Sequence, residues 1–484
     1  MYLGIDLGTS GLRAVLVDDS STVIGSADTH YGVDHPHPGW SEQDPADWIT
    51  ACREAVAALR SAHGAAFTAV RAIGLSGHMH GATLLDGSDT VLRPCILWND
   101  TRSAAEAAAL DAVAGVRDRS GNIVFPGFTA PKLRWVENHE RDVFDRVATV
   151  LLPKDYLRLW LTGEAVSDCS DSAGTSWLDV GARDWSDALL DAGHMRADQM
   201  PRLVEGAAVS GELRAELLGE WGLSGPVRVA GGGGDNAAAA VGAGCAREGD
   251  GFVSLGTSGV LLAARAGYAP APESAVHTFC HALPDTWYQM GVMLAATDCL
   301  NWLARLLGRA PADLAAEVEQ PITGPSDTVF LPYLSGERTP HNDSAARGAF
   351  AGLAIADDPA DLTRAVMQGV AMGLRDSLDA LHSTGATPSR LLAIGGGARS
   401  RFWLETLATV LGVPLDVPEG GEFGAALGAA RLAMLCDNTR AVDAVLTSPP
   451  LAYTVEPRAE LLEDYAAAHA RFKAVYPALK SALA

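Results

Sequence analysis

The chain has 484 residues, of which 48% are hydrophobic, and a formal net charge of −23 at pH 7. This length exceeds what one hydrophobic core usually serves, so the sequence predicts a globular protein of about two large domains. The acidic balance disfavours nucleic acid and anionic membrane surfaces as partners, because both would be repelled.

The cysteine pattern and the absence of targeting signals favour a cytoplasmic protein. The seven cysteines are scattered, without a Cys-x-x-Cys pair or the Cys/His spacing of a zinc site, so we expect reduced thiols. No signal segment precedes the first apolar strand at Tyr2, and no apolar run reaches the roughly 18 to 20 residues of a membrane span. The predicted location is the cytoplasm, without membrane attachment.

The first part of the chain alternates strands and helices. Residues 2–18 predict a β-hairpin, in which apolar strands flank a turn of glycines and hydroxyl residues. Ala-rich amphipathic patterns predict helices over 46–62 and 104–114, and the apolar run 70–77 predicts a strand between them. This alternation is typical of an α/β protein.

The same plan returns further along the chain. Residues 226–230 predict a strand, and four glycines connect it to a predicted helix over 235–244. A second hairpin is expected over 251–263, where apolar runs again flank a glycine-rich turn. A strand over 390–397 then leads into a helix over about 400–411.

These elements suggest where the chain divides. A boundary near 244–251 separates a predicted N-terminal domain, residues 1–246, from a predicted C-terminal domain, residues 247–436. The remaining tail, residues 437–484, shows only helical patterning, so we expect a helical tail that packs on one of the two domains.

The pentapeptide Leu-Gly-Thr-Ser-Gly occurs twice, over residues 7–11 and 255–259, each time at the turn of a predicted hairpin. Glycines let the backbone approach an anion closely, and hydroxyl groups and turn amides donate hydrogen bonds to phosphate oxygens. A single copy would suit an ordinary glycine-rich hairpin, whereas two copies indicate a duplicated phosphate-binding turn. The predicted phosphate contacts are Gly8, Thr9, Ser10, Gly256, Thr257 and Ser258.

Two aspartates beside glycine-rich segments are the predicted catalytic carboxylates. Asp235 follows four glycines that leave room for a substrate hydroxyl, and we expect it to be a general base; a plain helix cap is the alternative. Asp6 lies at the end of the first strand, within reach of a metal ion on nucleotide phosphates, whereas the second hairpin has Ser254 at the matching position. This asymmetry favours Asp6 as a ligand of Mg²⁺, acting through water, over a carboxylate bonded to turn amides.

Several residues after the predicted strand 70–77 are candidates for binding a sugar. Met79 and His80 follow that strand at an end where open α/β sheets bind ligands, although His80 could also be an ordinary loop histidine. Further along, Trp98 and Arg102 place an aromatic ring and a guanidinium close together, which suits polyol recognition. A structural cap and ion pair would use the same residues.

A third glycine-rich turn, Gly-Gly-Gly-Ala, joins the predicted strand over 390–397 to the helix after it. Its members Gly396 and Gly397 would let an adenine or ribose lie flat on the backbone. A tight connection between strand and helix is the alternative interpretation.

Together these motifs resemble the FGGY carbohydrate kinases. The resemblance rests on the paired Gly-Thr-Ser hairpins, the Gly-Gly-Asp-Asn segment before the second one, the run over 127–136 and the Gly-Gly-Gly-Ala turn. It implies two duplicated α/β domains of the actin-like (ribonuclease H-like) ATPase fold, with a cleft between them. Within the family the likeness is strongest to members that phosphorylate D-xylulose. ATP, Mg²⁺ and transfer of the γ-phosphoryl group to the C5 hydroxyl of D-xylulose are therefore implied.

The resemblance also implies roles for individual residues. Asp235 matches the catalytic base of the family, Asp6 the acidic residue of its first phosphate motif, and Met79 with His80 its sugar-binding pair. Asn236 would contact the sugar. On the nucleotide side the implied contacts are Arg13, Thr257, Gly396 and Gly397.

The chain departs from the family pattern at two positions. His78 stands where Gln is more usual, and Gln368 stands where Glu is common. We expect these changes to affect substrate choice and helix ion pairing rather than catalysis itself.

Other functions of the fold remain as alternatives. Chaperones and filament formers need a peptide-binding module or polymerising surfaces, and sugar-responsive repressors carry a DNA-binding segment in front; we expect neither. A kinase for another pentulose, for glycerol or for a deoxy sugar is the realistic rival, because hydroxyl contacts decide specificity. The expected partners are a small sugar and ATP, closure of the two domains on the sugar is anticipated, and a homodimer is common in the family.

Overall fold

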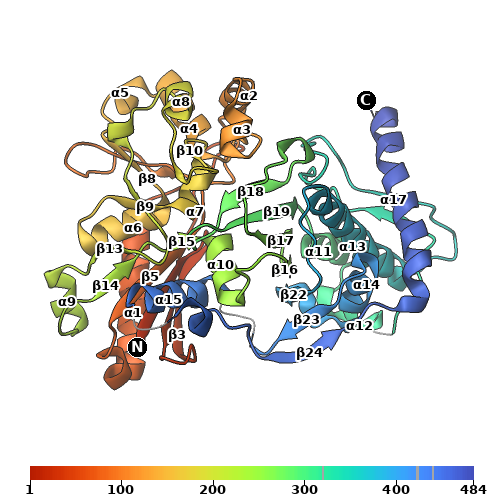
Figure 1. Cartoon of the computed structure of the whole chain (residues 1–484). Helices are drawn as coiled ribbons and strands as arrows, with labels where there is room; N and C mark the ends of the chain where they lie inside the picture. Colours follow the sequence, from red (N-terminus) through yellow and green to blue (C-terminus); the bar gives the residue numbers. More distant parts are fainter. Residues whose placement is uncertain (319–320, 421–423, 439–440, 484) are drawn as a thin grey trace.

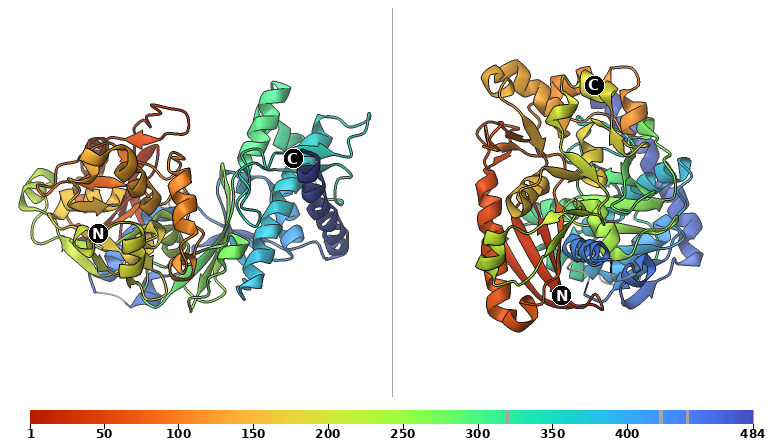
Figure 2. Two further views of the ribbon diagram at one scale, coloured as in Figure 1. Left: turned by 90° about the horizontal axis from the view of Figure 1, so that it is seen from above. Right: turned by 60° about the vertical axis from the view of Figure 1, so that its left-hand side comes forward.

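The computed structural model describes residues 1–318, 321–420, 424–438 and 441–483. The chain forms two halves, each built around a mixed seven-stranded sheet. Figure 1 shows these halves side by side, the first mainly red to yellow and the second mainly green to blue. Seen from above in Figure 2, the halves approach each other along one side of the molecule.

The first sheet lies in the N-terminal half. Its strands are β1 (Tyr2–Leu7), β2 (Gly11–Val17), β3 (Val23–His30), β5 (Ala72–Gly77), β13 (Val209–Glu212), β14 (Arg228–Ala230) and β15 (Gly233–Gly234). They are ordered β13-β14-β5-β1-β2-β3, and β15 pairs with the end of β5. β1 therefore lies between its antiparallel hairpin partner β2 and the parallel strand β5.

The second sheet repeats this plan. Its strands are β16 (Gly251–Leu255), β17 (Gly259–Arg265), β18 (His277–Cys280), β19 (Trp287–Met293), β22 (Leu391–Ile394), β23 (Leu415–Pro418) and β24 (Leu451–Val455). Along β3-β2-β1-β5-β14-β13 and along β19-β17-β16-β22-β23-β24, successive pairs are antiparallel, antiparallel, parallel, parallel and antiparallel. The duplication predicted from the repeated pentapeptide is confirmed.

Ten longer helices accompany these sheets in the described part of the chain. They are α1 (Pro45–Phe67), α2 (Ala104–Asp111), α4 (Thr129–His139), α6 (Pro153–Thr162), α10 (Asp235–Ala243), α11 (Thr297–Leu307), α13 (Pro359–Ser383), α14 (Arg401–Leu411), α15 (Gly424–Cys436) and α17 (Leu462–Leu483). The predicted helices that begin near residues 46, 104, 235 and 400 are therefore confirmed, with shifts of a few residues at their ends.

Shorter elements fill the connections. The short strands are β4 (Glu42–Gln43), β6 (Thr83–Leu85), β7 (Cys95–Ile96), β8 (Thr149–Leu151), β9 (Val166–Asp168), β10 (Leu178–Asp179), β11 (Asp184–Trp185), β12 (Arg202–Val204), β20 (Val329–Leu331) and β21 (Ala349–Ala351). The short helices are α3 (Val116–Ser120), α5 (Arg141–Phe144), α7 (Cys169–Ser172), α8 (Asp187–Ala192), α9 (Ala215–Trp221), α12 (Pro311–Glu317) and α16 (Val442–Val445), with 3₁₀ turns η1 (Ala173–Thr175), η2 (Ala197–Gln199), η3 (Pro272–Ser274), η4 (Gly396–Arg399) and η5 (Ala459–Leu461).

Helix α15 belongs to the second half in sequence but packs on the sheet of the first half (Figure 1). A β-carbon added at Gly74 of β5 would lie 1.8 Å from the carbonyl oxygen of Ala429, so the backbones of sheet and helix are in direct contact. At the crossing of α15 with α10, a β-carbon at Gly428 would lie 1.7 Å from the carbonyl oxygen of Ala238. The two halves are thus joined through a tight helix crossing, which a division of the sequence at residue 246 does not describe.

The expectation of a purely helical tail is wrong. Residues Leu451–Val455 form β24, which pairs antiparallel with β23 at the edge of the second sheet. Helix α17 then packs against α14 and β20 of the same half. The tail is therefore part of the C-terminal half in space.

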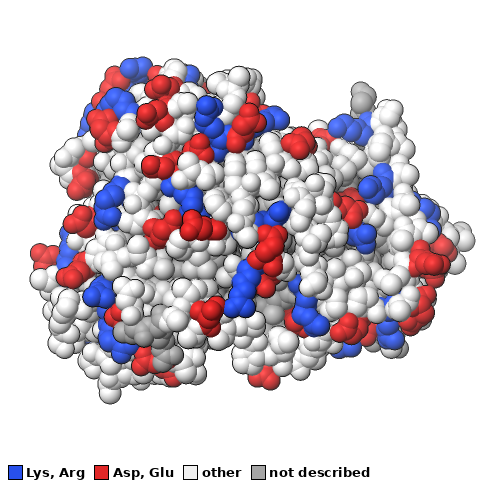
Figure 3. Space-filling model, viewed as in Figure 1, with Lys and Arg blue, Asp and Glu red and all other residues white. Residues whose placement is uncertain are grey.

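None of the described helices is long and apolar enough to cross a membrane. On the face drawn in Figure 3, acidic and basic side chains are interspersed over both halves.

Candidate active site

The two glycine-rich turns have the same place in the two sheets. The first connects β1 to β2, where the Gly8 amide donates to the Gly11 carbonyl oxygen at 2.9 Å, and the second connects β16 to β17. The indole of Trp98 donates to the Thr9 hydroxyl oxygen at 3.0 Å. The side chains of Ser10, Thr257 and Ser258 are exposed, so their hydroxyls can reach a ligand.

Asp6 lies on β1 between two neighbouring strands. In the sheet register it faces Arg13 on β2 and Ser76 on β5. Burial raises the pKa of its carboxyl, and the Ser76 hydroxyl and the Arg13 charge oppose this rise. One carboxylate oxygen, Oδ1, is buried and finds no hydrogen-bond partner within the described part of the chain. An orphaned buried carboxylate oxygen beside a glycine-rich turn is suited to a cation or to a water molecule that a cation holds.

Asp235 lies across β5 from Asp6. The two-residue strand β15 pairs with Ser76 and Gly77 of β5, and Asp235 follows it as the first residue of α10. Its Oδ1 accepts hydrogen bonds from the amide nitrogen and the side-chain Nδ2 of Asn236, at 2.7 and 2.9 Å. Burial, and next the negative charge of Asp6, raise the pKa of Asp235 to about 7. A carboxylate with that pKa can exchange a proton near neutral pH.

Met79 and His80 lie beside this carboxylate pair. Met79 is 4% exposed, and its Cγ would be 2.8 Å from a β-carbon added at Gly234, the residue before Asp235. His80 adopts a positive φ of 71° and its Nδ1 lies 2.7 Å from the carbonyl oxygen of Gly174. Because a carbonyl only accepts, Nδ1 carries the proton and Nε2 is left as an acceptor. Burial lowers the pKa of His80 to about 3, so the ring is neutral.

Trp98 and Arg102, both predicted as sugar contacts, differ in exposure: the first is exposed and the side chain of the second is buried. Trp98 is 45% exposed, and its indole donates to the Thr9 hydroxyl of the first glycine-rich turn. The Arg102 side chain is 1% exposed, bonds Asp100 and Glu42, and stacks on Trp40 at 3.7 Å. The ion pair that the sequence left as the alternative for Arg102 is the arrangement observed, which corrects its prediction as a sugar contact.

The side chains at the two positions that depart from the family pattern are packed or hydrogen-bonded within the protein. His78 is 2% exposed, packs edge-on to Trp48 and has a pKa lowered to about 3 by burial. Gln368 on α13 bonds the Gly324 carbonyl oxygen and the Tyr465 hydroxyl, so it ties α13 to the C-terminal helix. Both residues are used inside their own half.

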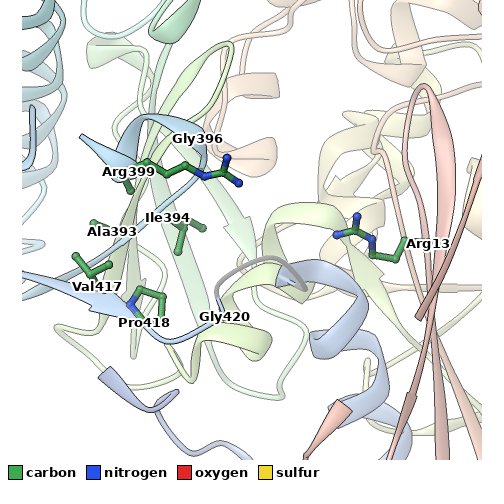
Figure 4. A pocket seen from close by; sticks show the side chains of 10 residues that line it. Arg13, Ala393, Ile394, Gly396, Arg399, Val417, Pro418 and Gly420 are labelled. Carbon is green, nitrogen blue, oxygen red and sulfur yellow. The ribbon is translucent and has the colours of Figure 1, made fainter. Parts of the chain in front are cut away.

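A cavity of about 660 Å³ lies between the two halves (Figure 4). Arg13 lines it from the first half, and Gly396 and Arg399 line it from the second. Figure 4 shows the guanidinium groups of Arg13 and Arg399 pointing toward each other across the cavity. Arg13 also pairs with Asp28, with its Nε 2.6 Å from Asp28 Oδ1. Guanidinium groups on both sides of a cavity suit an anionic ligand such as a polyphosphate. The cleft predicted between two domains corresponds to this cavity.

The predicted adenosine turn has one member in the cavity and one behind it. Gly395 has a φ of 89°, and a β-carbon there would lie 2.7 Å from the Leu255 carbonyl oxygen, so the turn requires glycine. Gly396 lines the cavity. A β-carbon on Gly397 would lie 2.8 Å from the Leu255 Cβ, which fixes the turn against the second phosphate hairpin.

Three residues of the site did not emerge from the sequence. The ring of Phe128 stacks on His80 with centroids 4.5 Å apart. Lys132 is fully buried and its Nζ donates to the His80 carbonyl oxygen at 2.8 Å, holding the loop. Arg399 lies in the cavity. A basic residue directly after the Gly-Gly-Gly-Ala turn was a usable signal for Arg399, and the run over 127–136 contained both other residues.

Comparison with known proteins shows the family to which the chain belongs. The FGGY family of carbohydrate kinases matches with its N-terminal domain over residues 1–242 and its C-terminal domain over residues 251–436. The chain is 48% identical over 483 residues to a protein named xylulose kinase from Escherichia coli (strain K12), covering 99% of both chains. It is 37% identical over 437 residues to a xylulose kinase from Bacillus subtilis (strain 168), covering 89% of this chain and 87% of the relative.

Solved structures show the same fold. A xyloylose kinase from Brucella ovis has a TM-score of 0.98 at 57% identity, with 99% of each chain covered. The glycerol kinase of Plasmodium falciparum, solved with ADP, has a TM-score of 0.87 at 19% identity over 94% of each chain, which shows the shared two-domain fold. The protein is therefore an enzyme, a kinase, and it belongs to the FGGY family of carbohydrate kinases.

Proposed function

We propose that this kinase transfers the γ-phosphoryl group of ATP to the C5 hydroxyl of D-xylulose, giving D-xylulose 5-phosphate and ADP. The observation that carries the proposal is the pair of half-buried carboxylates, Asp6 and Asp235, on either side of β5 and next to the first glycine-rich turn. Two xylulose kinases with 48% and 49% identity over 99% of this chain support the choice of sugar.

Asp235 is the general base in this proposal. Its ionised carboxylate accepts the proton of the sugar hydroxyl as the hydroxyl oxygen attacks the phosphorus. A pKa of about 7 suits this role, because the group is substantially ionised near neutral pH and still binds the proton it receives. Phosphoryl transfer builds little charge on the attacking oxygen before the transition state, so a weak, well-placed base suffices.

The sugar is proposed to lie between Asp235 and the loop of Met79 and His80. The neutral His80 ring offers Nε2 to a sugar hydroxyl, because Nδ1 is bonded to Gly174. Met79 supplies apolar contact against the sugar carbons, and Asn236 contributes its side-chain oxygen while its amide stays on Asp235.

The nucleotide is proposed to lie in the cavity between the halves. The two glycine-rich turns, Thr257 and Arg13 would bind its phosphates, and the turn with Gly396 and Gly397 its adenosine. Residues 1–246 then supply the sugar site and the first phosphate turn, and residues 247–436 the adenosine site.

Asp6 is proposed to hold Mg²⁺. Its carboxylate is an oxygen ligand of the kind that Mg²⁺ prefers, and its orphaned Oδ1 fits a cation or a water molecule of its shell. When bound there, Mg²⁺ would supply positive charge to the nucleotide phosphates.

Closure of the two halves is proposed to accompany sugar binding. Arg13 and Arg399 face each other from different halves across the cavity (Figure 4). Their approach would surround the phosphates with positive charge and exclude water, which would otherwise compete with the sugar for the γ-phosphoryl group.

The test is ADP release by the purified protein with Mg-ATP, alone and with D-xylulose, D-ribulose, L-xylulose, L-ribulose or glycerol. D-xylulose should give by far the strongest stimulation. Preference for another compound would keep the kinase and discard the substrate, and ATP hydrolysis indifferent to all of them would contradict the proposal.

The same assay tests the base. Asp235→Ala should remain folded and bind the sugar but lose turnover by about 10²- to 10⁴-fold, the usual contribution of a general base. Asp313→Ala is the matched control, since Asp313 is an exposed aspartate in the first turn of α12. Near-normal turnover by Asp235→Ala would refute the assignment.

A further inference from the structure

A buried cluster of charges lies behind the glycine strand that leads to Asp235. Lys154, at the start of α6, is fully buried, and its Nζ lies 2.6 Å from Asp155 Oδ1, 2.7 Å from Asp168 Oδ1 and 3.0 Å from Asp171 Oδ2. These three carboxylates are close enough to one another to hold a metal ion. The ammonium group of Lys154 already lies between the three carboxylates, so it takes the place that a metal ion would have.

Two cations serve the three carboxylates of the cluster. Arg158 is the second cation, with Nη1 3.1 Å from Asp155 Oδ1. Burial raises the pKa of Asp171 well above its ordinary value, and the positive charge of Lys154 opposes this rise. Buried ion pairs of this kind contribute little to stability. The role of the cluster is therefore better judged from the residues that it holds in place.

One arm of the cluster ends at the residue before Asp235. Asp168, bonded to Lys154, accepts a hydrogen bond from the Ser170 hydroxyl at 2.5 Å. The Ser170 oxygen in turn accepts a hydrogen bond from the amide of Gly234 at 3.2 Å. A hydroxyl can do both, because it donates one proton and accepts on its lone pairs.

A second arm ends at the other side of the glycine run. Asp155 pairs with Arg158, whose Nη2 donates to the carbonyl oxygen of Gly231. The Nη1 group also donates to the Val166 carbonyl oxygen at 2.8 Å, which fixes the guanidinium plane. One buried ammonium group therefore connects, through two carboxylates, to both ends of the segment 231–234.

Apart from these two arms, the glycine segment is held by backbone hydrogen bonds. The amides of Gly231 and Gly232 donate to the carbonyl oxygens of Ala208 and Gly206 at 2.8 and 2.9 Å. β-Carbons added at Gly231 and Gly232 would lie 2.3 Å from the carbonyl oxygens of Glu205 and Leu75, so side chains that could anchor the segment do not fit. Its pairing with β5 involves Gly233 and Gly234 alone. Its position therefore depends on backbone hydrogen bonds, and Asp235 follows it directly.

We propose that Lys154, Asp168, Ser170 and Arg158 are positioning residues for Asp235, which they hold in place by fixing the glycine segment at both ends. The inference rests on the proposed function, in which Asp235 is the base. A displacement of about 1 Å in a reacting group costs about 10²-fold in rate, so small movements of this segment should be visible in turnover.

The experiment compares Ser170→Ala with Ser170→Thr and with Ser120→Ala. The alanine removes the acceptor of the Gly234 amide without changing charge, and threonine restores a hydroxyl. Ser120 is a matched control, because it is equally buried and its hydroxyl bonds the Asn122 carbonyl oxygen in another part of the first half. Steady-state kcat, the KM for Mg-ATP and the thermal midpoint are measured for each protein.

We expect kcat of Ser170→Ala to fall about tenfold or more, with the KM for Mg-ATP unchanged and a thermal midpoint close to that of Ser120→Ala. Ser170→Thr should recover most of the turnover. A merely structural role would lower the thermal midpoint and leave kcat of the folded enzyme intact. Arg158→Lys keeps the charge beside Asp155 but loses the hydrogen bond to the Gly231 carbonyl oxygen. It should show the same loss of kcat. If Ser170→Ala does not fold, Arg158→Lys alone tests the positioning role.

Asp235→Asn is measured alongside to separate the two claims. If Asp235→Asn is inactive and folded Ser170→Ala or Arg158→Lys turns over like the wild type, the positioning role is overturned and the base assignment stands. If Asp235→Asn itself retains turnover, the proposed function fails, whatever the other variants do.

Discussion

At the scale of single residues, the site holds two carboxylates in surroundings that disfavour their charge. Burial raises the pKa of Asp6, and burial together with Asp6 raises the pKa of Asp235 to about 7. Carboxylates with raised pKa values lower the stability of the native state when they are ionised, and such groups are frequent at functional sites. The pair therefore has consequences for metal binding and for stability that can be measured separately.

Asp6→Ala should mainly damage the use of Mg-ATP. The variant loses the carboxylate beside the first phosphate turn, so the Mg²⁺ concentration for half-maximal rate should rise about 10- to 100-fold. Titration of activity with MgCl₂ at fixed ATP measures this, with Asp313→Ala as the control. A titration curve and a maximal rate equal to those of the wild type would refute the role of Asp6.

Asp235→Asn should stabilise the protein at alkaline pH. A carboxyl with a folded-state pKa of about 7 and an unfolded-state pKa near 4 makes the native state bind the extra proton between these values. Native stability is therefore lost as pH rises from about 4 through about 7, and the neutral amide removes this loss. Without nucleotide or divalent cation, the thermal midpoint of the variant should exceed that of the wild type at pH 8, and by much less at pH 5. An equal difference at both values would contradict the raised pKa.

The sequence was enough to predict which residues near strand ends belong to the candidate site. It was not enough to predict the hydrogen bonds and ion pairs that these residues form. Met79, His80 and Asp235 lie together because each follows a strand end or a glycine run that meets at one edge of the sheet. The pairing of Arg102 with Glu42 depends on a fold that joins distant segments, so the sequence left its role open. The buried Lys154 and Lys132 were missed for the same reason, since lysine normally indicates a surface.

At the scale of secondary-structure elements, the hairpins followed directly from the sequence but the helix crossing did not. Apolar runs around a glycine turn specify β1 with β2 and β16 with β17 through local chemistry alone. The contact of α15 with α10 depends on small residues more than 180 positions apart, such as Gly242 and Gly428. Strand β24 was missed because it lies at a sheet edge and is mostly exposed, which weakens the hydrophobic pattern of a strand.

Gly428→Ala should destabilise the protein by separating α15 from α10. The added methyl group would lie 1.7 Å from the Ala238 carbonyl oxygen, and backbone atoms cannot move aside as a flexible side chain can. Overpacking of this kind costs about 1 to 3 kcal/mol or more. Gly219→Ala is the matched control: Gly219 lies in α9 with nothing within 4 Å of the new carbon, so alanine should be neutral or add about 0.5 to 1 kcal/mol. Equal stability of the two variants in urea unfolding would show that the crossing is looser than described.

At the scale of the whole molecule, the duplicated sheets place corresponding groups on the two sides of the cavity. Each half contributes one glycine-rich turn and one cavity-lining arginine, while Asp6 and Asp235 both come from the first half. The repeated pentapeptide was enough to predict the duplication, because the same turn at the same place in two predicted hairpins indicates a repeated unit. The angle between the halves is not encoded in any local pattern, since it depends on the crossing of α10 and α15.

Ligand binding should change the angle between the halves. If both arginines must reach the phosphates, D-xylulose and Mg-ADP together should draw the halves closer, and the radius of gyration from small-angle X-ray scattering should fall relative to the free protein. Each ligand alone should have a smaller effect, because neither bridges the cavity fully. Asp235→Asn binds without a working base and should still close, so closure and chemistry are tested apart. The same scattering curves give the molecular mass and thereby test the expected homodimer. An unchanged radius with both ligands bound would contradict closure and leave the halves as a rigid frame around the cavity.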